Sequence, residues 1–319
     1  MRAGTKLPRS LKAVAIVGNG IIGHGVAQVF AMAGRNAVMI GRTDASLRKA
    51  VRKIETSLHD FVRHGLLARR DVPAVMKRIA TSTRLEAAAS AQLVIEAVTE
   101  DLALKRKIFA RLDRLCPPAI VLASSSGQPA SALAGGMRHP ERVIAAHFWF
   151  PPQLIPLVEV CGGPQTSPAV VHWVAKQLKA AGKEPVVIDR EIPGFIGGRL
   201  QFALLREAWS LWASGAASAE AIDTVVRNSF GRRLGITGPL ESADLGGLET
   251  HFNFARTLLP HLDNRPAPAA AVGRLVRSGA TGAAAGRGIH DWKKRSSQAL
   301  LKARMDELFR WLVEHPAKR

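Results

Sequence analysis

The pattern of apolar and polar residues changes near residue 190. Before that point, apolar runs of strand length alternate with longer segments in which apolar residues recur every three or four positions. This alternation predicts parallel strands joined by helices. The predicted strands are 13–17, 37–40, 79–83, 92–98, 119–123, 142–146, 157–160 and 184–188. The clearest predicted helices between them are 21–33, 45–64, 102–115 and 167–182.

Beyond residue 190 the strand-like runs stop and helical spacing takes over. The polar segment 189–193, which contains a proline, is the best boundary, so we expect one domain at 1–191 and an all-α domain at 192–319. The expected helices are 195–215, 217–229, 241–262 and 293–314, with 263–288 mainly as connecting chain. One apolar stripe predicts a core or a dimer surface and consists of Leu200, Leu204, Leu205, Trp209 and Trp212.

A glycine turn joins the first predicted strand to the first predicted helix. Gly18 allows the tight turn, Gly20 leaves room for a pyrophosphate, and Gly23 lets the helix pack closely on the strand. The free N–H groups at the helix start would bind the phosphates. This context predicts a Rossmann-type α/β fold, doubly wound with a mostly parallel sheet. The expected cofactor-binding residues are Gly18, Asn19, Gly20, Ile21, Ile22 and Gly23; the alternative is a glycine-rich turn without a ligand.

The end of the second predicted strand bears on which dinucleotide is bound. A carboxylate at the position of Gly41 would accept hydrogen bonds from the adenosine ribose and select NAD. Gly41 has no side chain, and Arg42 and Thr43 follow it with a guanidinium and a hydroxyl that suit a 2′-phosphate. The sequence therefore favours NADP over NAD. The alternative is that Arg42 is a solvated loop residue and Asp44 caps the next helix.

The formal charge of +20 limits the choice of partners. The basic residues are scattered among acids without an aromatic-basic nucleic-acid motif, so we expect anionic small molecules and no nucleic acid. Arg63, His64, Arg69 and Arg70 form a basic group that suits the phosphates of a large substrate, or is a solvated face.

Cysteine usage and hydropathy predict the compartment. The only cysteines are Cys116 and Cys161, which points to a reducing cytoplasm. The sequence contains no apolar run of membrane-spanning length and no signal-peptide core, so no membrane is expected.

The residue types that are missing restrict how a proton is handled. The chain contains no tyrosine, which excludes dehydrogenases that rely on a Tyr–Lys pair, and it has too few cysteines for a Cys-liganded catalytic zinc. Histidine is then the best proton donor and acceptor.

Polar groups gather at the predicted strand ends. His147 comes at the end of one predicted strand, and Glu159 is a charge inside the next one, which is costly unless it is paired. A carboxylate behind an imidazole fixes its tautomer and stabilises the imidazolium, although a structural salt bridge of Glu159 is the alternative. Ser126, Glu100 and Lys105 also lie near carboxyl ends of strands, where open α/β sheets bind ligands.

Taken together, these features resemble the 3-hydroxyacyl-CoA dehydrogenase family from about Lys12 to Trp292. The segments that carry the resemblance are Val17–Gly23, Ile95–Glu100, Leu122–Ser126, His147–Pro151, Leu157–Val160, Pro193–Ile196, Gly238–Asp244 and Gly286–Trp292. Leu154–Glu159 and Arg199–Ala203 also look like the carnitine dehydrogenase and λ-crystallin branch, whose members act on free hydroxy acids.

The resemblance implies a role for several residues and a helical domain that forms a homodimer. His147 and Glu159 would be the acid–base pair, Ser126 the active-site serine that also lies at the cofactor, and Glu100 and Lys105 cofactor contacts. Three positions depart from the family pattern. Gly41 replaces an acid, Phe150 replaces an asparagine, and a second asparagine is lost in the pair Gly197–Gly198. Phe150 predicts a smaller or more apolar pocket.

The expected function is hydride transfer between a nicotinamide cofactor and a 3-hydroxyacyl-CoA, with His147 as acid and base. The basic group at 63–70 favours this substrate class. The Ile155-Pro156 variant and the missing asparagines favour a free 3-hydroxy acid, such as carnitine or a sugar acid. A catalytically weak dinucleotide-binding structural protein is the third possibility, against which the presence of Ser126, His147 and Glu159 argues.

Overall fold

The computed structural model describes residues 7–315 as two compact units. One unit contains the chain up to Ile196 together with the chain from Arg304 on, and the other contains Gly197–Ala303. The expected boundary at 191/192 differs from this division, because 192–196 and the last part of the chain group with the sheet.

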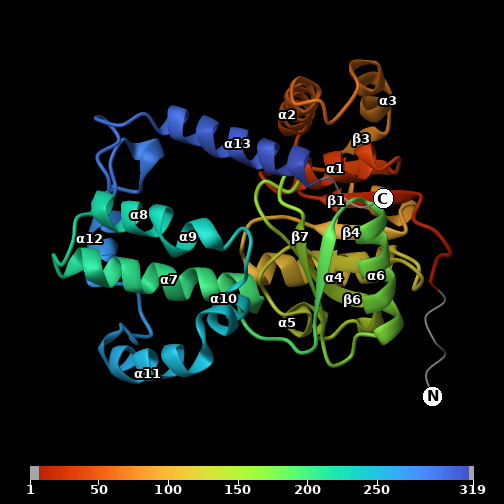
Figure 1. Cartoon of the computed structure of the whole chain (residues 1–319). Helices are drawn as coiled ribbons and strands as arrows, with labels where there is room; N and C mark the ends of the chain where they lie inside the picture. The colour runs from red at the N-terminus through yellow and green to blue at the C-terminus, as the bar shows by residue number, and fades with distance from the viewer. Residues whose placement is uncertain (1–6, 316–319) are drawn as a thin grey trace. The chain divides into compact units, whose positions relative to one another are not determined.

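The first unit is built on an eight-stranded sheet with the order β3-β2-β1-β4-β5-β6-β7-β8 (Figure 1). Every neighbouring pair is parallel except β6 and β7, which are antiparallel. The predicted doubly wound, mostly parallel fold is therefore confirmed. The strands are β1 Ala13–Val17, β2 Asn36–Ile40, β3 Ile79–Ser82, β4 Leu93–Glu96, β5 Val121–Ser124, β6 Val143–Phe148, β7 Leu157–Gly162 and β8 Glu184–Ile188.

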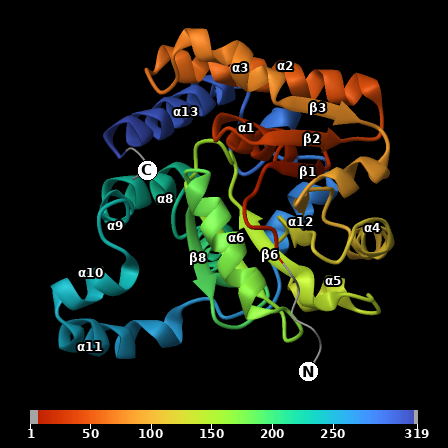
Figure 2. The same cartoon turned by 90° about the vertical axis from the view of Figure 1, so that its right-hand side faces the viewer.

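Helices cover both faces of this sheet. Apolar side chains of α1 (Gly23–Met32), α2 (Asp44–Arg63), α3 (Val72–Lys77) and α6 (Pro168–Ala180) form one buried cluster with the strands. Those of α4 (Leu102–Leu115) and α5 (Ala130–Ala134) form the cluster on the other side. Successive strand residues such as Val14 and Ala15 belong to different clusters, as the two-residue period of a strand requires. Figure 2 shows α6 beside β8, at the end of the sheet.

Helix α2 shows how the sequence sets a helix start. Its predicted apolar face is largely buried, with Leu47, Ile54 and Leu58 in the core. The capping residue is Thr43, whose Oγ1 accepts a hydrogen bond from Ser46 N at 3.2 Å. The expectation that Asp44 is the cap is therefore wrong. Asp44 is the first helical residue, where its charge still favours the helix dipole.

The second unit is helical, as predicted. Its helices are most of α7 (Phe195–Ala213), α8 (Ala219–Asn228), α9 (Phe230–Arg233), α10 (Pro239–Gly246), α11 (Leu248–Leu258), α12 (Ala270–Arg277) and the start of α13 (Ser297–Glu314). Two expectations need correction. The segment 263–288, expected mainly as connecting chain, contains α12, a short helix whose Ala-, Gly- and Arg-rich sequence gave no clear helical signal. The expected helix 241–262 is broken at Gly247, whose φ of 86° belongs to the left-handed region.

A buried lysine fixes the loop between β6 and β7. The Lys183 ammonium donates to the carbonyl oxygens of Pro152 and of Ile155, the latter at 2.8 Å. Burial lowers the pKa of Lys183 to about 7. This loop joins the strand of His147 to the strand of Glu159, so Lys183 supports the turn between them.

Lys183 makes stability depend on pH in a defined direction. Between about pH 7 and about pH 10 the unfolded chain holds the lysine proton more tightly than the folded chain, so the free energy of unfolding rises with pH. We expect the free energy of unfolding of the wild type to rise with pH relative to that of Lys183→Met, by at most about 1.4 kcal/mol per pH unit. Urea denaturation across this range measures it. Lys179→Met, at an exposed position of α6, is the control, and a pH-independent difference contradicts the prediction.

Candidate active site

The glycine turn between β1 and α1 has the shape that a dinucleotide requires. A Cβ on Gly18, whose φ is 111°, would lie 2.5 Å from Ala97 O, and a Cβ on Gly23 would lie 1.9 Å from Gly18 O. A Cβ on Gly20 would meet nothing within 4 Å. Gly18 and Gly23 are thus required because the backbone comes too close for a side chain, whereas Gly20 leaves open space at the turn. These residues fit the pyrophosphate of a dinucleotide.

Sequence reasoning missed a residue that braces this turn. His24 is buried in α1, and its Nδ1 lies 2.5 Å from Gly20 O. Burial lowers the pKa of His24, so the neutral ring donates to the carbonyl from Nδ1. Its position directly after the last glycine of the motif was the available signal.

The end of β2 is crowded around Gly41. A Cβ at this position would lie 2.8 Å from Leu47 Cδ2 and 2.9 Å from Asn19 Oδ1. The Gly41 N–H donates to Ser82 O at 3.0 Å. Arg42 is exposed next to it, and Thr43 caps α2. A side chain at this position would require the side chains of Leu47 and Asn19 to move, and Gly41 itself presents no carboxylate at the end of β2.

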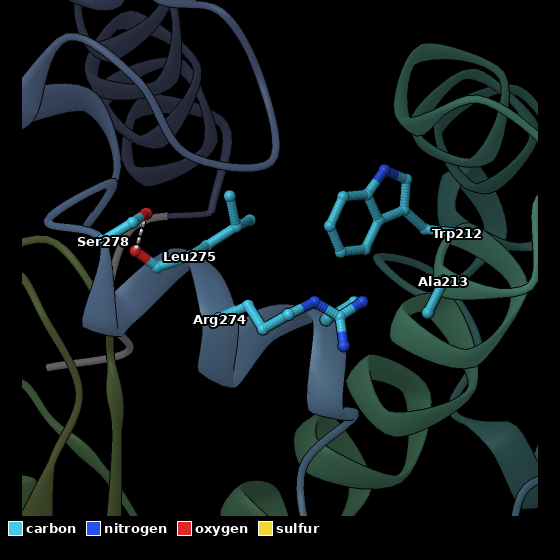
Figure 3. A pocket seen from close by; sticks show the side chains of 6 residues that line it. Trp212, Ala213, Arg274, Leu275 and Ser278 are labelled. Atoms are coloured by element: carbon cyan, nitrogen blue, oxygen red, sulfur yellow. Dashed lines mark hydrogen bonds between the residues drawn. The ribbon is translucent and has the colours of Figure 1, made fainter.

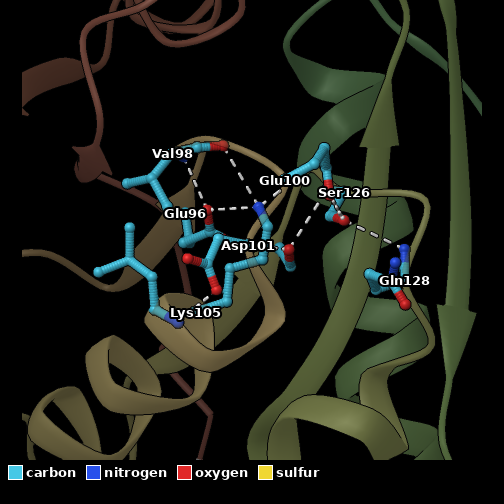
Figure 4. Close-up of polar contacts among 9 residues, drawn as sticks. Glu96, Val98, Glu100, Asp101, Lys105, Ser126 and Gln128 are labelled. Carbon is cyan, nitrogen blue, oxygen red and sulfur yellow. Dashed lines mark hydrogen bonds and ion pairs between the residues drawn. The ribbon is translucent and has the colours of Figure 1, made fainter.

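A polar network joins β4, α4 and the turn after β5 (Figure 4). The Lys105 ammonium lies 2.8 Å from Glu96 Oε1 and 3.8 Å from Glu100 Oε1. Glu96 Oε2 also accepts from Ser124 Oγ at 2.7 Å, and Ser126 Oγ donates to Glu100 Oε2 at 2.6 Å. Each serine is thus bound to one carboxylate, and the lysine lies between the two carboxylates.

Lys105 was expected to contact the cofactor, but the network places its side chain in the interior. Its side chain is 1% exposed, so it is an internal partner of Glu96 rather than an open surface group. The exposed member is Glu100, at 63%. Glu96 and Ser124 were not predicted. The available signal for Glu96 was a charge inside the predicted apolar strand 92–98, the same signal that drew attention to Glu159.

His147 and Glu159 face each other across the antiparallel strands β6 and β7. His147 Nδ1 lies 2.8 Å from Glu159 Oε2, and Glu159 is 2% exposed. His147 lies inside β6, which continues to Phe148, rather than beyond the strand end. With Nδ1 held by the carboxylate, Nε2 is the nitrogen that can exchange a proton with a ligand.

Further donors hold the Glu159 carboxylate in place. Trp149 Nε1 donates to Oε2 at 3.2 Å, and Ile196 N donates to Oε1 at 2.9 Å. Ile196 lies in the first turn of α7, where the helix dipole favours an anion. The turn before it contains Phe195, a buried residue with φ of 48°. Sequence reasoning found the His–Glu pair but not Trp149 or Ile196.

Ser126 and His147 lie near the carboxyl ends of the neighbouring strands β5 and β6. Ser124 of β5 pairs with Ala145 of the parallel strand β6, and Ser126 and His147 each follow two residues later. Neighbouring strands lie about 4.8 Å apart, so both residues stand at the carboxyl ends of adjacent strands. Phe150 lies just beyond β6 and is 56% exposed. Its expected effect on the pocket stays a prediction.

Other features lie apart from these residues in the sequence. In the second unit, Trp212 and Ala213 of α7 face Arg274 and Leu275 of α12 across an open hollow (Figure 3). Of the residues that line it, Trp212 alone drew attention in the sequence, as part of the apolar stripe.

Within residues 7–315, no group of His, Cys, Asp and Glu could hold a metal ion. No helix in that range is long and apolar enough to cross a membrane.

Comparison with known proteins identifies the family. Residues 13–192 match the NAD-binding domain of 3-hydroxyacyl-CoA dehydrogenase, and residues 194–292 match its C-terminal domain. L-carnitine dehydrogenase of Streptomyces coelicolor is 37% identical over 243 residues, 76% of either chain. A probable 3-hydroxybutyryl-CoA dehydrogenase of Bacillus subtilis is 32% identical over 289 residues, 90% of this chain and 99% of that one.

A solved structure agrees with these matches. It is that of 5-formyl-3-hydroxy-2-methylpyridine 4-carboxylic acid 5-dehydrogenase, described as an NAD⁺-dependent dismutase. It superposes with a TM-score of 0.88 at 26% identity, covering 97% of this chain and 100% of that one. The predicted class, an oxidoreductase that uses a nicotinamide dinucleotide, is confirmed at the level of the family. The chain belongs to the 3-hydroxyacyl-CoA dehydrogenase family.

Proposed function

We propose that this protein oxidises the 3-hydroxyl of a 3-hydroxyacyl-CoA, and catalyses the reverse reduction, with His147 as general base and acid. The observation that carries the proposal is the His147–Glu159 pair, with Ser126 in the turn that follows the neighbouring strand β5. The nicotinamide cofactor, when bound, supplies the hydride acceptor or donor. The residues of the glycine turn, with Arg42, Thr43 and Glu100, are the ones proposed to hold it.

The protein groups divide the proton chemistry between them. In oxidation, His147 Nε2 takes the proton of the 3-hydroxyl, while Glu159 fixes Nδ1 and stabilises the imidazolium. In reduction the imidazolium returns this proton to the substrate oxygen. Ser126 has one hydroxyl proton, and it is directed at Glu100. For Ser126 to donate to the reacting oxygen, its hydroxyl must turn away from that carboxylate. Lys105 acts on the cofactor site through Glu100, because the buried Lys105 ammonium lies 3.8 Å from Glu100 Oε1.

The substrate class has two candidates. The basic group at 63–70 favours a CoA ester less strongly than its sequence suggested, because Arg63 pairs with Asp60 and His64 stacks on Phe309 at 4.2 Å. Arg69 and Arg70 are exposed. A free hydroxy acid is favoured by the similarity to L-carnitine dehydrogenases and by Phe150 in place of asparagine.

The helical unit and the cysteines support two further proposals. Large apolar side chains are exposed on the second unit, among them Ile236, Leu240, Leu245, Phe252 and Phe254, each more than 60% exposed. A homodimer would cover such a surface. Cys116 and Cys161 are both free and buried, as expected for an enzyme of the reducing cytoplasm.

The general-base role predicts the effect of His147→Gln. We expect kcat to fall by roughly 10²- to 10⁴-fold in both directions, because glutamine cannot exchange the proton. The measurement follows oxidation of NADH and NADPH with acetoacetyl-CoA, and reduction of NAD⁺ and NADP⁺ with 3-hydroxybutyryl-CoA. Dinucleotide affinity should be unchanged, which serves as the control for folding. Wild-type turnover in this variant would sink the proposal.

The substrate class is tested with the same wild-type protein. We expect reduction of acetoacetyl-CoA. No turnover with it, but turnover of L-carnitine in the oxidative direction, would move the assignment to free hydroxy acids. Dinucleotide binding without turnover of either compound would favour the structural-protein reading.

The end of β2 predicts a preference for NADPH over NADH. Arg42→Ala should lower kcat/KM for NADPH by roughly 10-fold, the value of one hydrogen-bonded ion contact, and leave kcat/KM for NADH nearly unchanged. Arg48→Ala, an exposed arginine on α2, is the matched control. Equal losses with both cofactors, or a wild-type preference for NADH, would show that Arg42 does not read the 2′-phosphate.

A further inference from the structure

Trp149 shares a carboxylate oxygen with His147. Both side chains approach Glu159 Oε2, His147 through Nδ1 at 2.8 Å and Trp149 through Nε1 at 3.2 Å. The two residues are two positions apart, so they project from the same side of the chain as it leaves β6. Their rings lie 5.5 Å apart.

Two donors on one oxygen do not act independently. A carboxylate oxygen that accepts an indole N–H has part of its negative charge compensated, so it stabilises a neighbouring imidazolium less. The indole also restricts rotation of the carboxylate, which Ile196 N holds from its other oxygen. Trp149 therefore affects both the orientation of Glu159 and the charge that His147 experiences.

We propose that Trp149 is a positioning residue of the acid–base pair, which fixes the Glu159 carboxylate and compensates part of the charge that this carboxylate presents to His147. This inference rests on the proposed role of His147. A phenylalanine at position 149 would keep an aromatic ring and remove only the donor, and therefore separates this role from packing.

Other charged groups near the pair stay in place in such a variant. Glu159 faces His147 from β7, and Glu100 is bound to Ser126 at the end of β5. Lys183 holds the loop after Trp149. Asp189 and Glu191 follow β8 and act on Cys161 of β7. The indole Nε1 of Trp149 donates to Glu159 Oε2, so a change in pH dependence in this variant reports the loss of that hydrogen bond.

The test is the pH dependence of kcat/KM in Trp149→Phe, measured in both directions with acetoacetyl-CoA and 3-hydroxybutyryl-CoA. Oxidation needs the neutral imidazole and reduction needs the imidazolium. We expect the midpoint of both profiles to move to higher pH by about half a unit to one unit, a ~3- to 10-fold change. Just above the wild-type midpoint, oxidation then slows while reduction accelerates, whereas the plateau rates change little.

The control is Trp173→Phe, which removes an indole N–H that donates to Pro8 O at 2.8 Å in another part of the first unit. It should leave the midpoint unchanged. If Trp149→Phe leaves the midpoint where it is in the wild type, the indole N–H does not act on the charge that Glu159 presents to His147, and the inference is overturned. Wild-type turnover in His147→Gln would instead overturn the proposed function.

If Trp149→Phe fails to fold, a measurement on the wild-type protein still tests the inference. The indole ¹H–¹⁵N resonance of Trp149 should shift with pH at the same midpoint as the rate profile, because its acceptor also serves His147. A resonance that stays constant through that midpoint would contradict a shared oxygen. If neither CoA ester is turned over, L-carnitine replaces them in the rate measurements.

Discussion

The buried carboxylate of Glu159 is the constraint on which the catalytic end of the sheet depends. A charge that is 2% exposed in the middle of a strand is costly unless several donors reach it. The chain provides donors from three places: His147 in β6, Trp149 after it and Ile196 in α7. The antiparallel register of β6 and β7 places His147 opposite Glu159, and Phe195, whose φ is 48°, directly precedes Ile196 at the start of α7.

The same principle operates at β4 with different chemistry. Glu96 is fully buried, and Lys105, Ser124 and the Val98 N–H satisfy it. Removing one partner of such a pair leaves an uncompensated charge in the interior, so the loop from Glu96 to Glu100 is tied closely to α4. Glu100 and Ser126, the groups proposed to contact ligands, are thus held next to a buried carboxylate whose hydrogen-bond partners are all in place.

The sequence predicted the elements well where the chain is periodic and long. Helix 102–115 and strand 184–188 were expected with the bounds that the structure has. Prediction failed where local signals compete: α12 is short and rich in small residues, and Gly247 breaks a pattern that is otherwise continuously helical. The His–Glu pair could be predicted because a charge in a strand demands a partner. Trp149 and Ile196 could not, because only strand register and the start of α7 bring them to Glu159.

Gly41 shows how packing and specificity can depend on one residue. The family pattern has an acid here, and the absence of one suits a 2′-phosphate. Yet the space that a side chain would need is filled by Leu47 and by Asn19 of the glycine turn. Leu47 belongs to the first turns of α2, whose start is fixed by the Thr43 cap. An acid at position 41 would therefore require the side chains of Leu47 and Asn19 to move, as well as add charge. The proposed preference for NADPH therefore involves a position at which the packing of Leu47 on α2 also limits the space for a side chain.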